Sequence, residues 1–315
     1  MKAPKLCLII PCFNEEKILE DSSLQLEAIF MTLIGSEVID SSSFIVFVDD
    51  GSRDATWRII ESLHHRVAFI KGLRLSRNFG HQNALLAGLA SFHQRADCFI
   101  TIDADLQDDI HTIHKMIEKY VEGNDIVYGV RKKRDNDSLF KKYSAIWFYK
   151  IMKLMGVDLV YNHADFRLSS SRVLAELLRF SEINLFLRGI YPLVGFKSTN
   201  VYYNRLERKA GETKYPFFKM VSFALTGITA FSVRPLRIIT IVGFLVFIVS
   251  LGASFYALYS YLFNNSVKGW MSIVLPMYLL GGIQLLFMGI LGEYLSKIYI
   301  EVKKRPRYAI ETELQ

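Results

Sequence analysis

Cysteine is scarce in this chain, which has only Cys7, Cys12 and Cys98 among its 315 residues. An odd number of cysteines without paired spacing argues against a disulfide framework and against a zinc site. We interpret all three as small buried side chains of a protein in a reducing compartment. Residues 1–11 carry only a short apolar run, which favours a strand over a signal peptide.

Two common phosphate-binding loops are also missing. The chain has neither the Gly-x-Gly-x-x-Gly pattern of dinucleotide-binding turns nor the Walker A pattern of triphosphate loops. A glycine-rich cradle is therefore not its means of binding phosphate, and a metal ion is the alternative. The formal net charge is +7, but the 38 basic residues do not form one block, which argues against a nucleic-acid partner.

Charge is absent from two long stretches, residues 238–263 and 269–292. Each exceeds the roughly 20 apolar residues that a membrane-spanning helix needs, although a buried pair of helices in a soluble protein is the alternative. Arg234 and Arg237 precede the first stretch. Basic residues also follow the second stretch, namely Lys297, Lys303, Lys304, Arg305 and Arg307. Because positive residues stay cytoplasmic, we expect both termini and the large domain on the cytoplasmic side of the inner (plasma) membrane.

The sequence predicts four parts. Residues 1–215 form an α/β domain, 216–234 an amphipathic helix in the membrane interface, 235–300 a two-helix transmembrane hairpin, and 301–315 a basic cytoplasmic tail. In the first part, strand-like runs alternate with helical stretches, which predicts a mainly parallel sheet. The strand-like runs are 6–11, 44–48, 68–75, 98–102 and 125–130.

Polar side chains follow four of these runs, and the carboxyl ends of parallel strands meet at one edge of a sheet, where ligands bind. They are Asn14 and Glu15, Asp49 and Asp50, Asp103 and Asp105, and Arg131. Asp103, Asp105 and Gln107 offer oxygen atoms at alternate positions, and this suits Mg²⁺ or Mn²⁺ held jointly with a diphosphate. The alternative is that the two aspartates only end a strand and bind no metal, because acidic residues are common at strand ends.

Four segments together resemble glycosyltransferase family 2, and the resemblance covers nearly the whole chain. They are Pro11-Cys12-Phe13-Asn14-Glu15-Glu16, Val48-Asp49-Asp50-Gly51-Ser52-Arg53-Asp54, Arg77-Asn78-Phe79-Gly80 with Asn83-Ala84-Leu85, and Asp103-Ala104-Asp105-Leu106-Gln107-Asp108. The resemblance implies a GT-A, Rossmann-like fold for the first part of the chain.

Later segments resemble the polyprenyl-phosphate sugar transferases of that family, in particular the GtrB-type bactoprenol glucosyltransferases. The segments are Asp165-Phe166-Arg167-Leu168, Asn184-Leu185-Phe186 with Arg188-Gly189, Glu207-Arg208, Gly211-Glu212-Thr213-Lys214, and Gly292-Glu293-Tyr294. Dolichol-phosphate mannose synthase is a further member that the chain resembles. Thr213 departs from the family pattern, where Ser is usual, but it keeps the hydroxyl group.

The resemblance assigns roles to single residues. The base and ribose of a nucleotide-sugar donor would contact Pro11, Phe13, Glu15, Val48 and Asp50. The donor diphosphate would lie along Asp103, Ala104 and Asp105, with Mg²⁺ or Mn²⁺ bound by Asp103, Asp105 and Gln107. Donor and acceptor phosphates would face Arg131, Arg208 and Lys214. Asp165 and Asp105 would be the catalytic residues, although a structural ion pair with Arg167 is the alternative for Asp165.

The implied reaction transfers a sugar, glucose from UDP-glucose in the first instance, to undecaprenyl phosphate at the cytoplasmic membrane face with inversion at the anomeric carbon. The lipid-linked product would pass to a flippase and an outer-face glycosyltransferase for cell-surface polysaccharide modification. Related enzymes suggest a homo-oligomer.

Three alternatives remain. The same reaction could use N-acetylglucosamine or another sugar. A processive polysaccharide synthase would need a Gln-x-x-Arg-Trp motif, which the chain lacks. A non-catalytic membrane sensor of nucleotide sugars is disfavoured, because the expected metal ligands and basic residues are all present.

Overall fold

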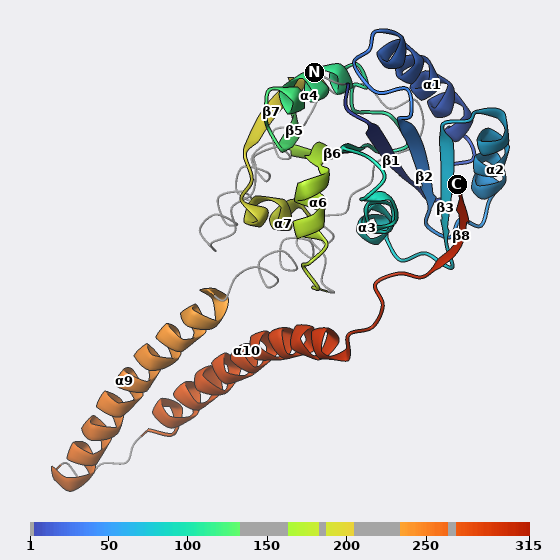
Figure 1. The fold of residues 1–315 in the computed structure, drawn as a ribbon. Helices are drawn as coiled ribbons and strands as arrows, with labels where there is room; N and C mark the ends of the chain where they lie inside the picture. Colours follow the sequence, from blue (N-terminus) through green and yellow to red (C-terminus); the bar gives the residue numbers. More distant parts are fainter. Residues whose placement is uncertain (1–2, 133–162, 183–186, 205–233, 264–268) are drawn as a thin grey trace. The chain divides into compact units, whose positions relative to one another are not determined.

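A computed structural model describes residues 3–132, 163–182, 187–204, 234–263 and 269–315 (Figure 1). The chain divides into two compact units. The first comprises Met1–Tyr149, Asp158–Tyr215 and Arg305–Gln315, and the second comprises Lys150–Val157 and Pro216–Lys304. Each unit is described by itself below.

A mixed sheet forms the centre of the first unit. Its described strands are β1 (Leu6–Cys12), β2 (Phe44–Asp49), β3 (Ile70–Leu75), β4 (Cys98–Thr101), β5 (Ile126–Arg131), β6 (His163–Ser170), β7 (Ser198–Tyr203) and β8 (Ile310–Leu314), in the order β7-β5-β6-β4-β1-β2-β3-β8. The strands from β4 to β3 in that order are parallel, whereas β6 and β8 run antiparallel to their neighbours. The predicted mainly parallel sheet is confirmed, and the five predicted strands lie within two residues of their expected bounds.

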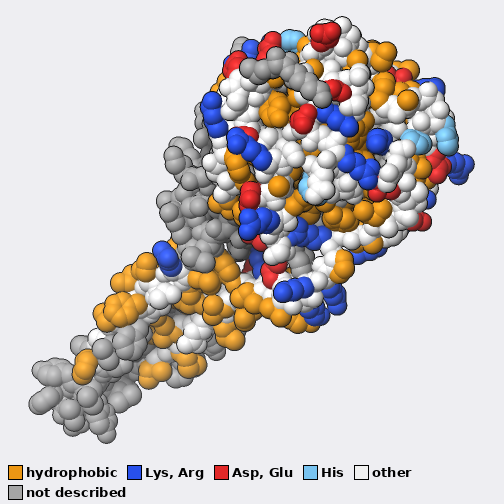
Figure 2. Space-filling view, in the orientation of Figure 1, with side chains coloured by type: hydrophobic (Ala, Val, Ile, Leu, Met, Phe, Trp, Pro, Cys, Tyr) orange, Lys and Arg blue, Asp and Glu red, His pale blue; other side chains and the backbone are white. Residues whose placement is uncertain are grey.

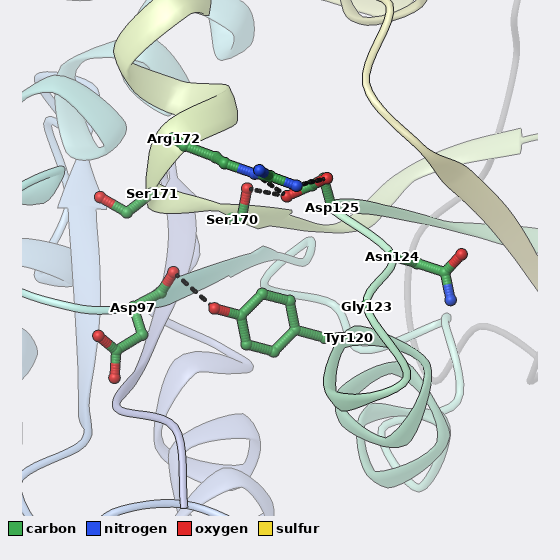
Figure 3. A pocket seen from close by; sticks show the side chains of 8 residues that line it. All are labelled: Asp97, Tyr120, Gly123, Asn124, Asp125, Ser170, Ser171 and Arg172. Atoms are coloured by element: carbon green, nitrogen blue, oxygen red, sulfur yellow. Dashed lines mark hydrogen bonds and ion pairs between the residues drawn. The ribbon is translucent and has the colours of Figure 1, made fainter. Parts of the chain in front are cut away.

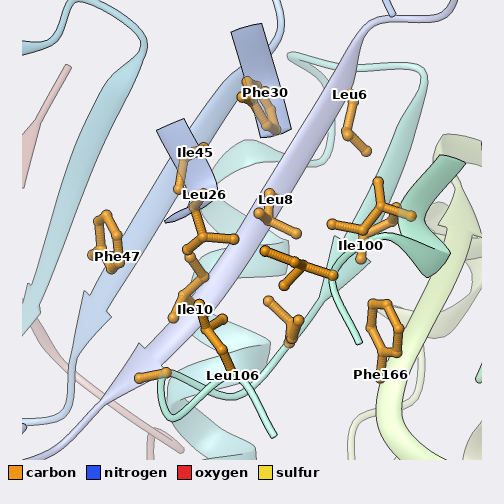
Figure 4. Packing of buried hydrophobic residues seen from close by; sticks show 14 of the residues in the cluster. Leu6, Leu8, Ile10, Leu26, Phe30, Ile45, Phe47, Ile100, Leu106 and Phe166 are labelled. Carbon is orange, nitrogen blue, oxygen red and sulfur yellow. The ribbon is translucent and has the colours of Figure 1, made fainter. Parts of the chain in front are cut away.

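Helices cover both faces of this sheet, which explains why β1 and β2 are buried along their whole length. Leu8 and Ile10 point to the face that packs against α1 (Leu19–Gly35), and α2 (Thr56–Arg66) and α4 (Thr112–Val121) add to the same apolar cluster (Figure 4). The alternate residue Ile9 points to the other face, against α3 (His81–Phe92). The three cysteines are buried and free, as predicted.

Two short helices follow β6 in the described chain. In α6 (Ser171–Leu177), the Ser170 side chain caps the first turn by accepting a hydrogen bond from the Val173 N–H. In α7 (Leu187–Val194), Tyr191 packs under Arg167 of β6, with the guanidinium carbon 4.4 Å from the ring centroid. Helix α7 therefore supports the β6 face that carries Arg167.

The end of the described chain returns to the sheet. Residues 301–315 are a separate tail in the sequence prediction, but residues 310–314 form β8, antiparallel to β3, with Leu314 opposite Gly72 (Figure 1). This strand covers the edge that β3 would otherwise expose.

The second unit contains α9 (Arg234–Phe263) and α10 (Trp270–Lys303). The two helices contact each other, and Gly243 lies opposite the Phe287 ring. Within the described residues, neither of them nor any other helix meets the length and hydropathy required to cross a membrane. The predicted interfacial helix over 216–234 lies outside the described residues except for Arg234.

Candidate active site

The carboxyl ends of β1, β2 and β4 meet at one edge of the sheet, because the strands are parallel and in register. Strand β6 runs the opposite way, so its beginning reaches the same edge. There the Thr101 hydroxyl donates a hydrogen bond of 2.5 Å to the Asp165 carbonyl oxygen. The structure thus brings Asp165, which lies late in the sequence, next to the Asp103 segment that follows β4.

The turn after β2 is held by a loop that follows β3. The Asp50 carboxylate accepts hydrogen bonds from the Phe79 N–H at 2.7 Å and the Gly80 N–H at 2.9 Å. Burial raises the pKa of Asp50, and these two N–H groups partly oppose that shift by stabilising the charged form. Asp50 therefore fixes the shape of the turn, residues 49–52, which we call the donor turn because the family resemblance predicts that it binds the nucleotide-sugar donor.

Gly51 lies at the centre of the donor turn with a φ of +66°, and its backbone packs on Arg77. In Gly51→Ala, the new Cβ would lie 2.4 Å from the Arg77 carbonyl carbon, so we expect a loss of about 3 kcal/mol in the free energy of unfolding. Denaturant unfolding measures the loss. Gly123→Ala is the matched control, because its φ is +89° and no described atom lies within 4 Å of the added Cβ. Equal losses in the two variants would contradict the close packing at Gly51.

The loop after β1 is tied to the donor turn. The Asn14 N–H donates to the Ser52 hydroxyl at 2.9 Å, and the Asn14 side-chain oxygen accepts from the Arg53 N–H at 2.9 Å. Asn14 has a φ of +56°, which turns the chain sharply and leaves the neighbouring Phe13 side chain 42% exposed. An exposed aromatic ring at this edge is available to stack against a nucleotide base, and Glu15 is half-buried beside it.

Two of the predicted donor contacts are placed differently from Phe13 and Glu15. Pro11 and Val48 are opposite each other in β1 and β2, and both are buried. The Val48 side chain points to Gly88 of α3, so it packs inside the domain. Ala104 is also buried, and its carbonyl oxygen accepts a hydrogen bond from the Ser22 hydroxyl.

The Asp103 segment is rich in negative charge. The pKa of Asp103 is raised to about 6, first by its partial removal from water and then by the charges of Asp165, Asp108 and Asp105, whereas His81 opposes the shift. His81 Nε2 lies 3.5 Å from Asp103 Oδ1. Like charges crowded in this way favour a bound cation.

The carboxylate and amide oxygens of this segment are the type of ligand that a hard divalent cation prefers. Asp103 and Asp105 are half-exposed, whereas Gln107 is buried. The Leu106 residue between them has a φ of +44°, which bends the segment between Asp105 and Gln107. In the part of the chain that the structure describes, no three His, Cys, Asp or Glu side chains form a group that could hold a metal ion.

Asp165 forms ion pairs with two arginines. Arg188 contacts both carboxylate oxygens, at 3.1 Å through Nε and 2.9 Å through Nη2, and Arg167 donates at 2.6 Å. Burial alone would raise the pKa of Asp165, but the charges of Arg188 and Arg167 lower it below its usual value. Asp165 is therefore a carboxylate at neutral pH and a weak proton acceptor, suited to holding Arg188 in place.

Arg131 at the end of β5 is engaged by Asp108. The guanidinium donates to Asp108 Oδ1 at 3.1 Å and 2.9 Å, and the Tyr203 hydroxyl donates to the same oxygen at 2.6 Å. This buried group ties the ends of β5 and β7 to the Asp103 segment. The other predicted phosphate contacts, Arg208 and Lys214, lie outside the described residues.

Sequence reasoning missed two residues of this site. His81 was given no role in the site, but it is exposed at the start of α3 and lies 3.5 Å from Asp103 and 3.8 Å from Asp165. Arg188 was noted only as part of a family segment. The signal for His81 was its position directly after the Arg77-Asn78-Phe79-Gly80 motif, whereas nothing in the sequence joins Arg188 to Asp165.

A shallow cavity of about 410 Å³ lies at the opposite edge of the sheet (Figure 3). Asp97 and Asp125 precede β4 and β5 there, and Arg172 forms an ion pair with Asp125. The Tyr120 hydroxyl donates to the Asp97 carbonyl oxygen. None of the residues predicted for donor, metal or acceptor lines this cavity, so the candidate active site is the carboxyl edge.

A sequence model of glycosyl transferase family 2 matches residues 7–178, which is more than half of the chain. The protein belongs to glycosyl transferase family 2, as the motifs predicted.

Relatives match almost from end to end. The chain is 50% identical to the uncharacterized glycosyltransferase YkoT of Bacillus subtilis strain 168, over 99% of this chain and 92% of that protein. It is 40% identical to the prophage bactoprenol glucosyl transferase homolog of Escherichia coli K12, over 98% of each chain. It is also 40% identical to the bactoprenol glucosyl transferase of Shigella phage SfV, over 99% of each chain.

Proposed function

We propose that this protein transfers glucose from UDP-glucose to a polyprenyl phosphate, undecaprenyl phosphate in bacteria, at the cytoplasmic face of a membrane. The observation that carries the proposal is the meeting of three features at one sheet edge: the donor turn, the acidic Asp103 segment, and Arg188 held by Asp165. The full-length similarity to bactoprenol glucosyl transferases supports glucose and the lipid acceptor.

The acceptor needs little activation. A phosphomonoester carries a charge of about −1.5 to −2 at neutral pH, so its oxygen attacks without a strong general base. The oxygen–C1 bond of the sugar forms as the bond from C1 to the donor diphosphate breaks, and attack opposite the leaving group inverts the anomeric carbon. A weakly basic Asp165 is compatible with this chemistry, because the dianionic form of the phosphate has no proton to remove.

The protein's larger task is to hold two anionic substrates together. Arg188, aligned by Asp165, presents a planar guanidinium that suits bidentate contact with a phosphate. Arg131, Arg208 and Lys214 remain proposed phosphate contacts on the strength of the family resemblance. Asp103, Asp105 and Gln107 would hold Mg²⁺ or Mn²⁺, which supplies positive charge to the leaving diphosphate when bound.

We also propose that α9 and α10 anchor the protein in the inner membrane, with the sheet domain and both termini cytoplasmic and residues 216–234 in the interface. Large apolar side chains are exposed along these helices, including Ile241 at 60%, Phe244 at 62% and Val249 at 71% (Figure 2). Such a surface is unfavourable in water and favourable in lipid. The protein should stay in the membrane pellet after alkaline carbonate washing, and release into the supernatant would contradict the anchor.

The decisive experiment supplies membranes that contain the protein with undecaprenyl phosphate, Mg²⁺ and a panel of radiolabelled nucleotide sugars. We expect label from UDP-glucose in the organic extract, reduced by about tenfold or more with EDTA and restored by added Mg²⁺ or Mn²⁺. Label from UDP-N-acetylglucosamine instead would change the sugar but not the reaction. Absence of lipid label with every donor would favour the non-catalytic sensor.

The proposed product, a lipid-linked monosaccharide, requires further steps before its sugar can be used. A lipid-linked monosaccharide formed at the cytoplasmic face needs a flippase and an outer-face glycosyltransferase before its sugar reaches a surface polysaccharide. We propose these two partners, and a homo-oligomeric enzyme, from the family resemblance.

A further inference from the structure

Strand β8 pairs with the carboxyl-terminal two thirds of β3, from Gly72 to Leu75. The antiparallel pairing runs from Leu314 opposite Gly72 to Ile310 opposite Leu75, and the Ser76 N–H then donates to the Ala309 carbonyl oxygen at 3.0 Å. Gly72 has no side chain, and the side chains of Leu314 and of Ile60 in α2 fill the space where a Cβ would lie. The position of β3 therefore depends on a segment from the far end of the described chain.

The donor turn lies beside the end of β3, because Asp49 at the end of β2 pairs with Arg74 of β3. Only Ser76 separates β3 from the loop 77–80 whose Phe79 and Gly80 N–H groups hold Asp50. The same loop packs its backbone against Gly51 with no room for a Cβ. A shift of the end of β3 would therefore move the loop and, with it, the donor turn.

A line of charges makes the same connection through side chains. Arg74 Nε lies 3.4 Å from Glu311 of β8 and 3.6 Å from Asp49 of the donor turn. Asp49 is fully buried, and its Oδ2 has no hydrogen-bond partner among the described residues. Arg74 is thus the cation that offsets this buried charge, and Glu311 contacts Arg74 from the β8 side.

We propose that β8 is a positioning element for the donor site, acting through β3 and loop 77–80 and through the Glu311–Arg74–Asp49 charges. The proposal rests on the proposed function, because it takes the turn at 49–52 to bind the nucleotide. This role can be distinguished experimentally from that of a strand that only covers the exposed edge of β3. A strand that only covers an edge would affect both substrates alike, whereas β8 should govern donor affinity and leave acceptor affinity unchanged.

The test uses the full-length protein in membranes, with separate KM values for UDP-glucose and undecaprenyl phosphate. Glu311→Gln should raise the donor KM about threefold, since the pair is half-exposed, and leave the acceptor KM unchanged. Glu313→Gln is the matched control in the same strand, because Glu313 pairs with Arg95 at 3.2 Å, away from the donor turn. Deletion of residues 310–315 should raise the donor KM by about tenfold or more.

UDP titration of the purified full-length protein measures the same effect without transfer. Weaker UDP binding in Glu311→Gln than in Glu313→Gln would support the proposal even if the acceptor or the sugar had been assigned wrongly. Equal UDP affinities in these two variants and the wild type would overturn it, as would a deletion variant that binds UDP normally. If the deletion variant does not fold, the comparison of the two point variants decides.

Discussion

The Asp165→Ala variant is expected to lose about 3 kcal/mol in the free energy of unfolding and nearly all transfer activity. The loss of stability follows from Arg167, which is 1% exposed and would keep its charge without a carboxylate partner. One of its terminal nitrogens, Nη1, already has no hydrogen-bond partner among the described residues. The loss of activity follows from Arg188, which would no longer be aligned. Denaturant unfolding and the lipid-label assay measure the two losses.

The double variant Asp165→Ala/Arg167→Met separates the two effects. Removing both buried charges should restore much of the stability, because the uncompensated cation is gone, but not the activity. An Asp165→Ala protein that is inactive yet as stable as the wild type would mean that the carboxylate acts on substrate directly.

The contribution of Asp165 to the free energy of unfolding should decrease as the pH is lowered. Its folded-state pKa lies below its unfolded value, so the stabilisation is fully present above about pH 4. It is lost as the pH falls from there toward the folded-state pKa, and the Asp165→Ala variant should lack this part of the acid dependence.

The Asp105→Ala variant is expected to lose activity without losing stability, with transfer reduced by about a hundredfold or more and stability within about 0.5 kcal/mol of the wild type. Asp105 is half-exposed, and its hydrogen bond from the Gln107 N–H is long at 3.4 Å. Its removal therefore disturbs the packing little, whereas it takes away a proposed ligand of the metal and diphosphate. The lipid-label assay and thermal unfolding measure both quantities.

Asp109→Asn is the control for Asp105→Ala, because Asp109 lies on the same segment and its carboxylate accepts from the His111 N–H. It should keep its activity. An Asp105→Ala protein that transferred glucose at the wild-type rate would show that the metal site has been assigned to the wrong residues.

Four of the five predicted strands, β1, β2, β4 and β5, are largely apolar runs, and such runs are visible in a sequence. Strand β3 alternates instead, with Lys71 and Arg74 between apolar residues. Strand β6 was missed because its apolar residues Ala164, Phe166 and Leu168 alternate with polar and charged ones. Its other face carries Asp165 and Arg167, which look like loop residues until Arg188 and Tyr191 from the later helix α7 cover them.

The site was predictable in its location but not in its pairings. Acidic residues at strand ends placed Asp50, Asp103 and Asp105 at one edge by topology alone. The partners of Asp50 and Asp103 are distant in the sequence, and so are the partners of Arg131, which are Asp108 and Tyr203. Val48 shows a second limit. Every residue of β2 is buried, so its pattern does not reveal which side chains point to α3.

The pairing of β3 with β8 sets an order for biosynthesis. The ribosome makes the chain from its amino end, so β3 is complete long before β8 emerges, and α9 and α10 lie between them. During that interval, the nascent sheet carries an uncovered edge strand, which can pair with other chains. In the proposed positioning role, β8 can support the donor turn only after both α9 and α10 have been synthesised.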